Sequence, residues 1–593
     1  TLTCPLHPAP CTLTCTLTCT LHPAPCTLHP APFLMRQATQ NIMNTSPAFW
    51  QFCCFASGAA AGACHLSDFL LVLSAFGIFF CCWLGRATFI RHCSALFLAI
   101  AGYAWACLFL ACPWQTYLRH MPRREGYAQL YLRICEAPAL PPELQELSSG
   151  REKWHAEILA MRNHLNSTWQ PAAGKVLLRS SKAMREQLQQ LELGEMLIGE
   201  GCLLLPPAEN SSGGYYGRYL QILGIQRIFL LRAINHKMGI DTGMQMRIAR
   251  WLQKIRGVLA IRLVSGLDHP DAARMLLALG LGMSGLLRAE TNQRFIRSGT
   301  IHIFSISGLH VGMVVLLAES FFRSCGLGLR LRWFLLVPVL LGYLLLTGTS
   351  PSVLRAFYMS LLCLYACWRF RPPSALNSLG FSGLLALIGN PLYILHSGFL
   401  YSYLIVAVLI LGWGSIREMK AVLLERRRWI PRKYQGWHHL EGTLANLAAA
   451  LASSALAWIG SAGITLRING QLCLLSPLVN LPLGTTVFLI LAFCPLKLLL
   501  AFTCPAAQKI SNGIAKVLLN SLQFWAETAS DSLLTWNAVP FSNLENFLYH
   551  LALGLWLLII TAKYQEKQRN DLAGQQSCST YDQKNSSQTL SRQ

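Results

Sequence analysis

The sequence is short of charge. Only 13% of its 593 residues are Asp, Glu, Lys or Arg, whereas 53% are hydrophobic. Soluble domains carry about twice that share of charged residues. The deficit arises from apolar runs between residues 69 and 562, each close to the roughly 20 residues that a helix needs to cross a bilayer. This excludes a soluble enzyme and predicts a polytopic α-helical membrane protein.

Acidic residues are the scarcer charged type. The chain has 26 Asp+Glu against 49 Lys+Arg, a net charge of +23. Cytoplasmic loops of membrane proteins are rich in Lys and Arg, which accounts for much of this excess. A polyanionic substrate is the alternative, and charge alone leaves both open.

Motor and metal motifs are missing. No GxxxxGK[ST] loop is present, so energy for transport would come from a partner. There are 22 Cys but no CxxC pair with a matching His/Cys pair. Several cysteines, such as Cys81, Cys82, Cys363 and Cys367, lie inside apolar runs and are interpreted as small hydrophobic residues. We expect no metal site and no cofactor.

The N-terminal region is of low complexity. Residues 1–34 repeat TLTC and TLHPAPC units, whose Pro and Thr do not build a packed core. We expect this segment to be disordered or an extension of the gene model, with true starts available at Met35 or Met43.

Two transmembrane helices are predicted within residues 65–113, at about 69–84 and 93–112. Arg86 and Arg91 lie between them, which places that loop in the cytoplasm. The segment after the second helix is then outside.

Residues 126–226 are polar and contain β-prone runs separated by turn signals: YAQLYLRI, HAEILAMRN, GKVLLRS and EMLIGEGCLLLPP. They predict a small extracytoplasmic β-barrel domain of OB type, inserted after the second transmembrane helix. Such barrels often bind oligonucleotides, but a role as spacer or assembly module remains open.

Residues 227–270 form a basic amphipathic segment that includes Arg232, Arg250 and Arg256. A helix on the membrane surface is the favoured interpretation, and a basic collar that guides phosphates is the other. Residues 273–565 are predicted to form a multi-span channel domain, and the polar tail at 566–593 is predicted to be disordered.

Four motifs lie in the multi-span region. They read SGTIHIFSISGLHVG (298–312), TGTSPSVLRA (347–356), NPLYILHSGFLYSYL (390–404) and LLSPLVNLPLG (474–484). They resemble the motifs of the ComEC-type competence channel family. The third departs at Leu400 and Tyr401, where Gln and Leu are usual.

The resemblance extends from about residue 65 to 560 and includes the end of the N-terminal barrel domain, LGEMLIGEGCLLLPPAENSSGGYYGRYLQILGI. Many family members also carry a C-terminal metallo-β-lactamase-like domain, which needs an HxHxDH-type ligand set. After residue 503 the only histidine is His550, so the sequence there contains no HxHxDH-type ligand set. We therefore expect a chain without its own nuclease.

The resemblance implies a function. It suggests a multi-pass channel of the bacterial cytoplasmic (inner) membrane that takes up single-stranded DNA in natural transformation, and not an enzyme. Single-stranded DNA and membrane lipid are the implied partners, together with an external DNA receptor and a cytoplasmic ATPase. Whether the chain forms a homo-oligomer stays open.

The motif residues predict a translocation path. A helix over 300–318 would place His302, Ile306 and His310 on one face. Polar groups at membrane depth are costly and usually face a protein interior or a water-filled path. The predicted path comprises His302, Ser305, Ser307, Gly308, His310, Gly312, Ser350, Pro351, Arg355, Ser397, Gly398, Phe399, Pro477, Asn480 and Pro482.

Each of these residues also has a structural interpretation. His310 would serve a packed helix contact, and Arg355 would either contact phosphate or extend to the interface. Pro351, Pro477 and Pro482 are interpreted as marking broken helices, which are tolerated where backbone lines a cavity.

The alternative function is a polytopic membrane enzyme, or a transporter of another substrate, that uses intramembrane His and Arg. An enzyme should show a nearby carboxylate. Glu290 and Glu319 are the only close candidates and neither has a motif around it, so the channel is favoured.

Basic loops predict the topology. Residues 415–433 contain seven Arg or Lys and should be cytoplasmic, as should Arg369 with Arg371. The span at 300–322 then enters from outside. This agrees with an external barrel only if the short run at 273–288 does not cross the membrane.

Overall fold

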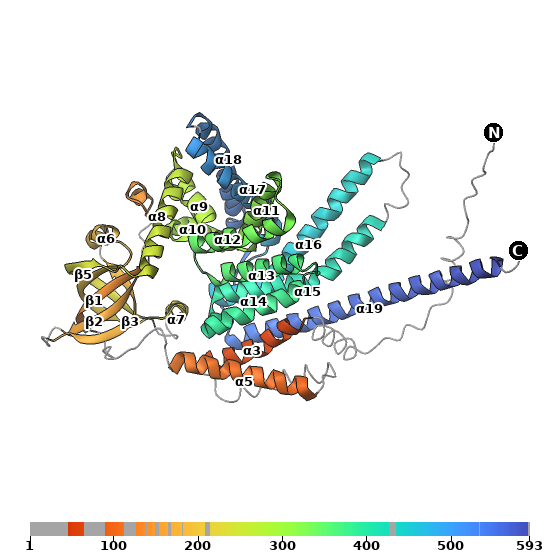
Figure 1. Ribbon diagram of the computed structural model, residues 1–593, viewed down its shortest axis with the longest axis horizontal. Coiled ribbons are helices and arrows are strands. Elements are labelled where there is room, and N and C mark those ends of the chain that lie inside the picture. The colour runs from red at the N-terminus through yellow and green to blue at the C-terminus, as the bar shows by residue number, and fades with distance from the viewer. Residues whose placement is uncertain are drawn as a thin grey trace.

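The structure is a computed structural model. It describes residues 46–63, 89–111 and 126–590, with gaps at 137–139, 149–152, 164–167, 181, 208–213, 426–434, 504 and 533. The predicted repeat at 1–34 and the predicted span at 69–84 lie outside the described residues. Figure 1 shows a small β-barrel at one end and a larger body of helices beside it.

Five strands close the barrel in the order β1-β2-β3-β5-β4, and the β3–β5 pair is parallel. Side chains alternate across each strand, so one face of the strands supplies a core that includes Leu130, Ile158 and Phe229. The strands are β1 (Gly126–Glu136), β2 (Trp154–Asn163), β3 (Gln170–Ser180), β4 (Glu195–Leu204) and β5 (Ile225–Ile240).

The four predicted β runs are confirmed as β1 to β4. The boundary predicted at residue 226 is wrong, because β5 begins at Ile225 and continues to Ile240. Its second half is mostly exposed and carries Arg232 and Lys237. Exposed basic side chains on a long strand look in sequence like the polar face of a helix, which explains the error.

Helix α8 (Met244–Val264) connects the barrel to the helical body, as Figure 1 shows. Two of the predicted collar arginines bind backbone here. Arg250 Nη1 donates to the Asp241 carbonyl at 2.9 Å, and Arg256 Nη2 donates to the Leu281 carbonyl at 2.8 Å. These guanidinium groups therefore join barrel, α8 and the next helix.

That next helix, α9 (Pro270–Leu281), is almost wholly buried. With 12 residues it is about 18 Å long, and the hydrocarbon core is about 30 Å thick. The run at 273–288 is thus too short to cross as a single helix, as the topology requires.

Five helices among the described residues are long and apolar enough to cross a membrane: α12, α15, α16, α17 and α19. The span predicted at 300–322 corresponds to α11, which is not among these five, and neither are α13 and α14. The helices of the body are α10 (Ala289–Arg297), α11 (Gly308–Ser324), α12 (Leu329–Thr347), α13 (Pro351–Trp368), α14 (Ala375–Gly389), α15 (Ser397–Glu425), α16 (Gln435–Asn469), α17 (Ser476–Thr503), α18 (Pro505–Ser530) and α19 (Asn543–Leu590).

Two helices, α15 and α19, extend beyond the ends that the sequence predicted for them. Helix α19 continues to Leu590, through the tail predicted to be disordered. Helix α15 continues to Glu425, so the first part of the predicted basic loop at 415–433 is helical. The rest of that loop, from residue 426, lies outside the described residues.

Helix α3 (Pro47–Ala63) was not predicted. It pairs with α5 (Phe89–Ala111) through small residues. A Cβ on Gly58 would lie 1.8 Å from the Ala99 carbonyl oxygen, so the two backbones are in direct contact. Small residues permit such approach.

We predict that Gly201→Ala destabilises the barrel. A Cβ there would lie 2.0 Å from the Leu230 carbonyl oxygen, where β4 pairs with β5. Overpacking of this kind costs about 1–3 kcal/mol, which should speed amide hydrogen exchange in β4 and β5 of the full chain. Gly126→Ala is the matched control, since nothing lies within 4 Å of its Cβ position. Equal exchange in both variants would contradict the packing described.

Candidate functional site

The first motif contains a chain break and not one continuous helix. A short 3-10 turn, η3 (Ile301–Phe304), ends before Ser305, and α11 begins only at Gly308. The predicted helix over 300–318 is therefore wrong, and His302, Ile306 and His310 do not share a helical face. His302 and Ser305 are exposed, whereas His310 is 2% exposed.

Ser307 and His310 form a capping box at the start of α11. The Ser307 hydroxyl accepts from the Leu309 amide at 3.3 Å, and the Ser307 amide donates to His310 Nδ1 at 3.3 Å. The reciprocal bonds satisfy backbone donors that a helix start leaves unpaired. His310 Nε2 is buried without a hydrogen-bond partner among the described residues. Nδ1 of His310 thus takes part in the helix cap, whereas Nε2 forms no hydrogen bond with a described residue.

Arg355 of α13 lies against this helix start. Its side chain is buried, and a Cβ on Gly308 would lie 3.3 Å from Arg355 Nη2. Arg355 Nη1 donates to the Ser402 carbonyl of α15, while its Nε is buried without a partner among the described residues. No described carboxylate forms an ion pair with it. The guanidinium therefore has a backbone ligand but no counterion.

The third motif begins α15 beside Arg355. The Ser352 hydroxyl, three residues before Arg355, donates to the Gly398 carbonyl at 3.1 Å. The Gly398 amide donates to His396 Nδ1 at 3.0 Å. Phe399 is buried and stacks on Tyr403, with 4.2 Å between ring centroids. These contacts fix the first turn of α15, from which Ser402 binds Arg355.

The fourth motif packs against the start of the first. Gly299 has a φ of 73°, and a Cβ there would lie 3.0 Å from the Ser476 hydroxyl, directly before Pro477. Pro477 and Pro482 do not break their helix, contrary to expectation, because α17 runs continuously from Ser476 to Thr503. The Pro482 carbonyl accepts from the Thr486 hydroxyl at 2.8 Å.

The predicted residues thus fall into separate groups. The cluster around Arg355, called here the arginine cluster, brings together Ser307, Gly308, His310 and Arg355 with the Ser397–Phe399 turn. Ser350 is the exposed N-cap of α13, and Pro351 is its buried first residue. Gly312 has nothing within 4 Å of its Cβ position. Pro477, Asn480 and Pro482 belong to α17.

Four residues that contact or flank the arginine cluster were not singled out from the sequence. They are Ser352, His396, Ser402 and Tyr403, which lie inside or beside the second and third motifs. A signal existed for His396, a histidine directly before Ser397. Ser402 acts through its backbone carbonyl, which no side-chain pattern marks. Among the described residues, no group of three His, Cys, Asp or Glu side chains forms a metal site.

Five of the described helices are long and apolar enough to cross a bilayer, and the chain is a multi-pass protein of the inner membrane. Residues 279–564, just under half of the chain, match the family model described as "Competence protein". This match agrees with the ComEC-type motifs found in the sequence.

Two curated relatives match parts of the chain. ComE operon protein 3 of Bacillus subtilis (strain 168) is 32% identical over 168 residues, 28% of this chain and 21% of that protein. An uncharacterized protein of Aquifex aeolicus (strain VF5) is 28% identical over 281 residues, 47% of this chain and 59% of that protein. The chain thus spans a fifth and about three fifths of these two relatives. No solved structure gives a significant match.

We predict that Gly308→Val displaces Arg355, because the added side chain would occupy the space against Nη2. Gly312→Ala, one turn further along α11, should be tolerated. Overpacking of this kind costs about 1–3 kcal/mol, so the thermal unfolding midpoint of the purified full chain should be lower for Gly308→Val than for Gly312→Ala. Equal midpoints for the two variants would show that position 308 is not packed against Arg355.

Proposed function

We propose that this chain takes part in DNA uptake during natural transformation and conducts single-stranded DNA across the bacterial cytoplasmic membrane. The match to the competence family model supports the process, and the arginine cluster supports the substrate. The single observation that carries the proposal is a buried Arg355 that lacks a carboxylate partner among the described residues.

Two positive groups face each other in the arginine cluster. The guanidinium of Arg355 lies at the first residue of α11, and a helix N-terminus carries about half a positive charge. An uncompensated buried charge costs several kcal/mol. A phosphodiester passing this point would supply the missing counterion, since guanidinium groups and helix N-termini both bind phosphate.

An enzyme is less well supported. Of the two carboxylates closest in sequence to the first motif, Glu319 bonds to Arg332 on α12, and Glu290 is exposed in α10. Neither contacts His310 in any described interaction. The expected acid–base partner for intramembrane chemistry is therefore lacking among the described residues, and conduction explains the cluster better.

We further propose that the barrel is an OB-like domain on the external face of the membrane. Its five-strand order and parallel β3–β5 pair are consistent with that fold. Lys153 lies over Tyr216 and Tyr219, 5.6 Å and 4.7 Å from the ring centroids, on the side of the barrel nearest the helical body. An external DNA receptor and a cytoplasmic ATPase would supply and pull the strand, with one chain or several forming the path.

We predict that Arg355→Ala and His310→Ala abolish DNA entry while both proteins stay in the membrane. Arg355→Lys should restore part of the activity, because it keeps the charge but not the fork that binds phosphate. Labelled DNA reaching the cytoplasm of a deletion strain carrying each variant is the measurement. A drop of about 100-fold for Arg355→Ala corresponds to ~2.7 kcal/mol.

The control for that experiment is Arg330→Ala, an exposed arginine at the start of α12. Its uptake should stay near wild type. Normal uptake by both Arg355→Ala and His310→Ala would contradict the proposed role of the arginine cluster.

We predict opposite accessibility for two exposed positions. With reactive native cysteines replaced, Gln187→Cys in the barrel domain should react with a membrane-impermeant thiol reagent added to intact cells. Ala421→Cys, within the basic segment at 415–433, should be protected until the cells are opened. External labelling of Ala421→Cys together with protection of Gln187→Cys would refute this topology.

A further inference from the structure

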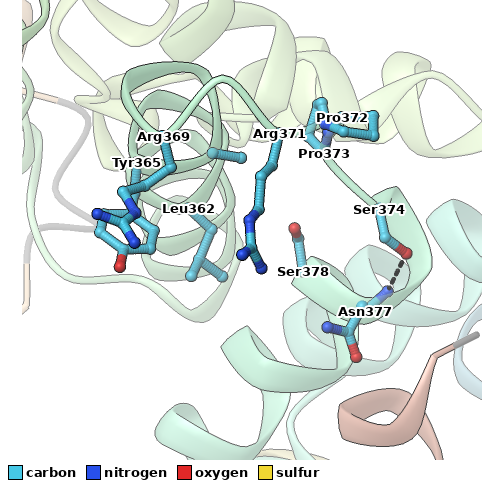
Figure 2. Close-up of a pocket in the computed structure, with 10 residues that line it drawn as sticks. Leu362, Tyr365, Arg369, Arg371, Pro372, Pro373, Ser374, Asn377 and Ser378 are labelled. Atoms are coloured by element: carbon cyan, nitrogen blue, oxygen red, sulfur yellow. Dashed lines mark hydrogen bonds between the residues drawn. The ribbon is translucent and has the colours of Figure 1, made fainter.

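A hollow lined by two arginines, two serines and several apolar side chains lies where α13 ends and α14 begins. Its volume is about 310 Å³, and it is lined by Leu362 and Tyr365 of α13, by the turn that holds Arg369 and Arg371, and by Ser374 and Ser378. Figure 2 shows the Arg371 side chain extending into the space between Leu362 and Ser378. The motif residues described above do not line it.

The hollow is positively charged and lacks a counterion. Arg369 and Arg371 form no ion pair and no side-chain hydrogen bond with any described residue, and no acidic residue lines the hollow. The N-cap of α14 also lies here, where the Ser374 hydroxyl accepts from the Asn377 amide at 3.4 Å. The helix N-terminus adds to the positive potential of the two arginines.

The turn that carries the arginines is held by two backbone hydrogen bonds and contains a phenylalanine with a positive φ. Phe370 has a φ of 54°, and it is the only described residue other than glycine with positive φ. The Arg371 amide bonds to the Ala366 carbonyl at 2.9 Å, and the Phe370 amide bonds to the Cys367 carbonyl at 3.0 Å. This is a Schellman motif, in which glycine is usual at the position of Phe370. A large aromatic side chain is thus kept here despite its backbone cost.

Exposed aromatic side chains surround the same end of α13. Tyr365, Trp368 and Phe370 are 59%, 48% and 74% exposed. Aromatic residues gather at the membrane–water interface, and arginines at that level meet the lipid headgroups. The positive-inside bias places Arg369 and Arg371 on the cytoplasmic side, where the leaflet contains anionic lipid.

We propose that this hollow binds the phosphate headgroup of an anionic phospholipid. Arg369 and Arg371 contact the phosphate, the Ser374 and Ser378 hydroxyls lie beside it, and the acyl chains run along the exposed aromatic side of α13. Lipid is favoured over nucleic acid as the source of the phosphate because aromatic and basic residues at one end of a membrane helix are typical of the membrane–water interface. This inference does not depend on DNA conduction.

The test uses the purified full chain and lipid retention measured by native mass spectrometry. Phosphatidylglycerol should bind and phosphatidylcholine should not. The double variant Arg369→Gln/Arg371→Gln should weaken phosphatidylglycerol binding roughly 30-fold, about fivefold for each arginine. The matched control is Arg323→Gln/Arg330→Gln, which removes the same charge at the α11–α12 connection, where both residues are exposed.

Several outcomes would overturn the proposal. One is an equal loss in the control variant, which would indicate general charge attraction. Another is equal binding of phosphatidylcholine. Competition by soluble glycerol 3-phosphate at the lipid's own concentration would indicate a site for small phosphates. Binding of a short single-stranded oligonucleotide that is lost in Arg369→Gln/Arg371→Gln, with lipid binding unchanged, would make this a nucleic-acid contact. Uptake by Arg355 variants tests the proposed function separately.

Discussion

The contact between Arg355 and the start of α11 is the constraint on which the helical body depends. A guanidinium at that depth must be satisfied by protein groups or by a ligand. The structure satisfies it in part, through the Ser402 carbonyl of α15, and brings α11, α13 and α15 together to do so. Glycine suits position 308 because a larger side chain there would crowd Nη2. The first three motifs therefore form one junction of three helices, although they are far apart in the sequence.

The barrel is joined to this junction through the third motif. The Tyr219 ring of α7 (Gly214–Ile222) lies 5.6 Å from the His396 ring, and Asn390 Nδ2 donates to the Ile222 carbonyl at 3.2 Å. His396 in turn accepts from the Gly398 amide at the start of α15. A displacement of α7 would therefore reach the first turn of α15 through two contacts, Tyr219–His396 and His396–Gly398. An oligonucleotide bound near Lys153 would sit at the outer end of this series.

Elements with simple periodicity or long apolar runs could be predicted from the sequence. β-prone runs between turn signals mark β1 to β4, and hydropathy marks α12, α15 and α19. Prediction from residue spacing fails where side chains bond to the backbone and end or start a helix. The spacing of the first motif is helical, yet η3 ends at Phe304 and the capping box of Ser307 and His310 starts α11 at Gly308. The Ser402 carbonyl could not be predicted, since backbone ligands leave no side-chain signal.

The two arginine sites lie on one helix and differ in their surroundings. Arg355 and Arg369 are 14 residues apart on α13 and its cap, a rise of about 21 Å. The first guanidinium is buried among helices, whereas the second faces an open hollow beside exposed aromatics. A headgroup bound as proposed would act together with the hydrogen-bonded turn at the C-terminal end of α13 to keep the helix from sliding along its axis. Arg355 has one described hydrogen bond and fits closely against Gly308, so a shift of even about 1 Å would disrupt its position. Such anchoring of α13 would therefore help to keep the buried arginine in place.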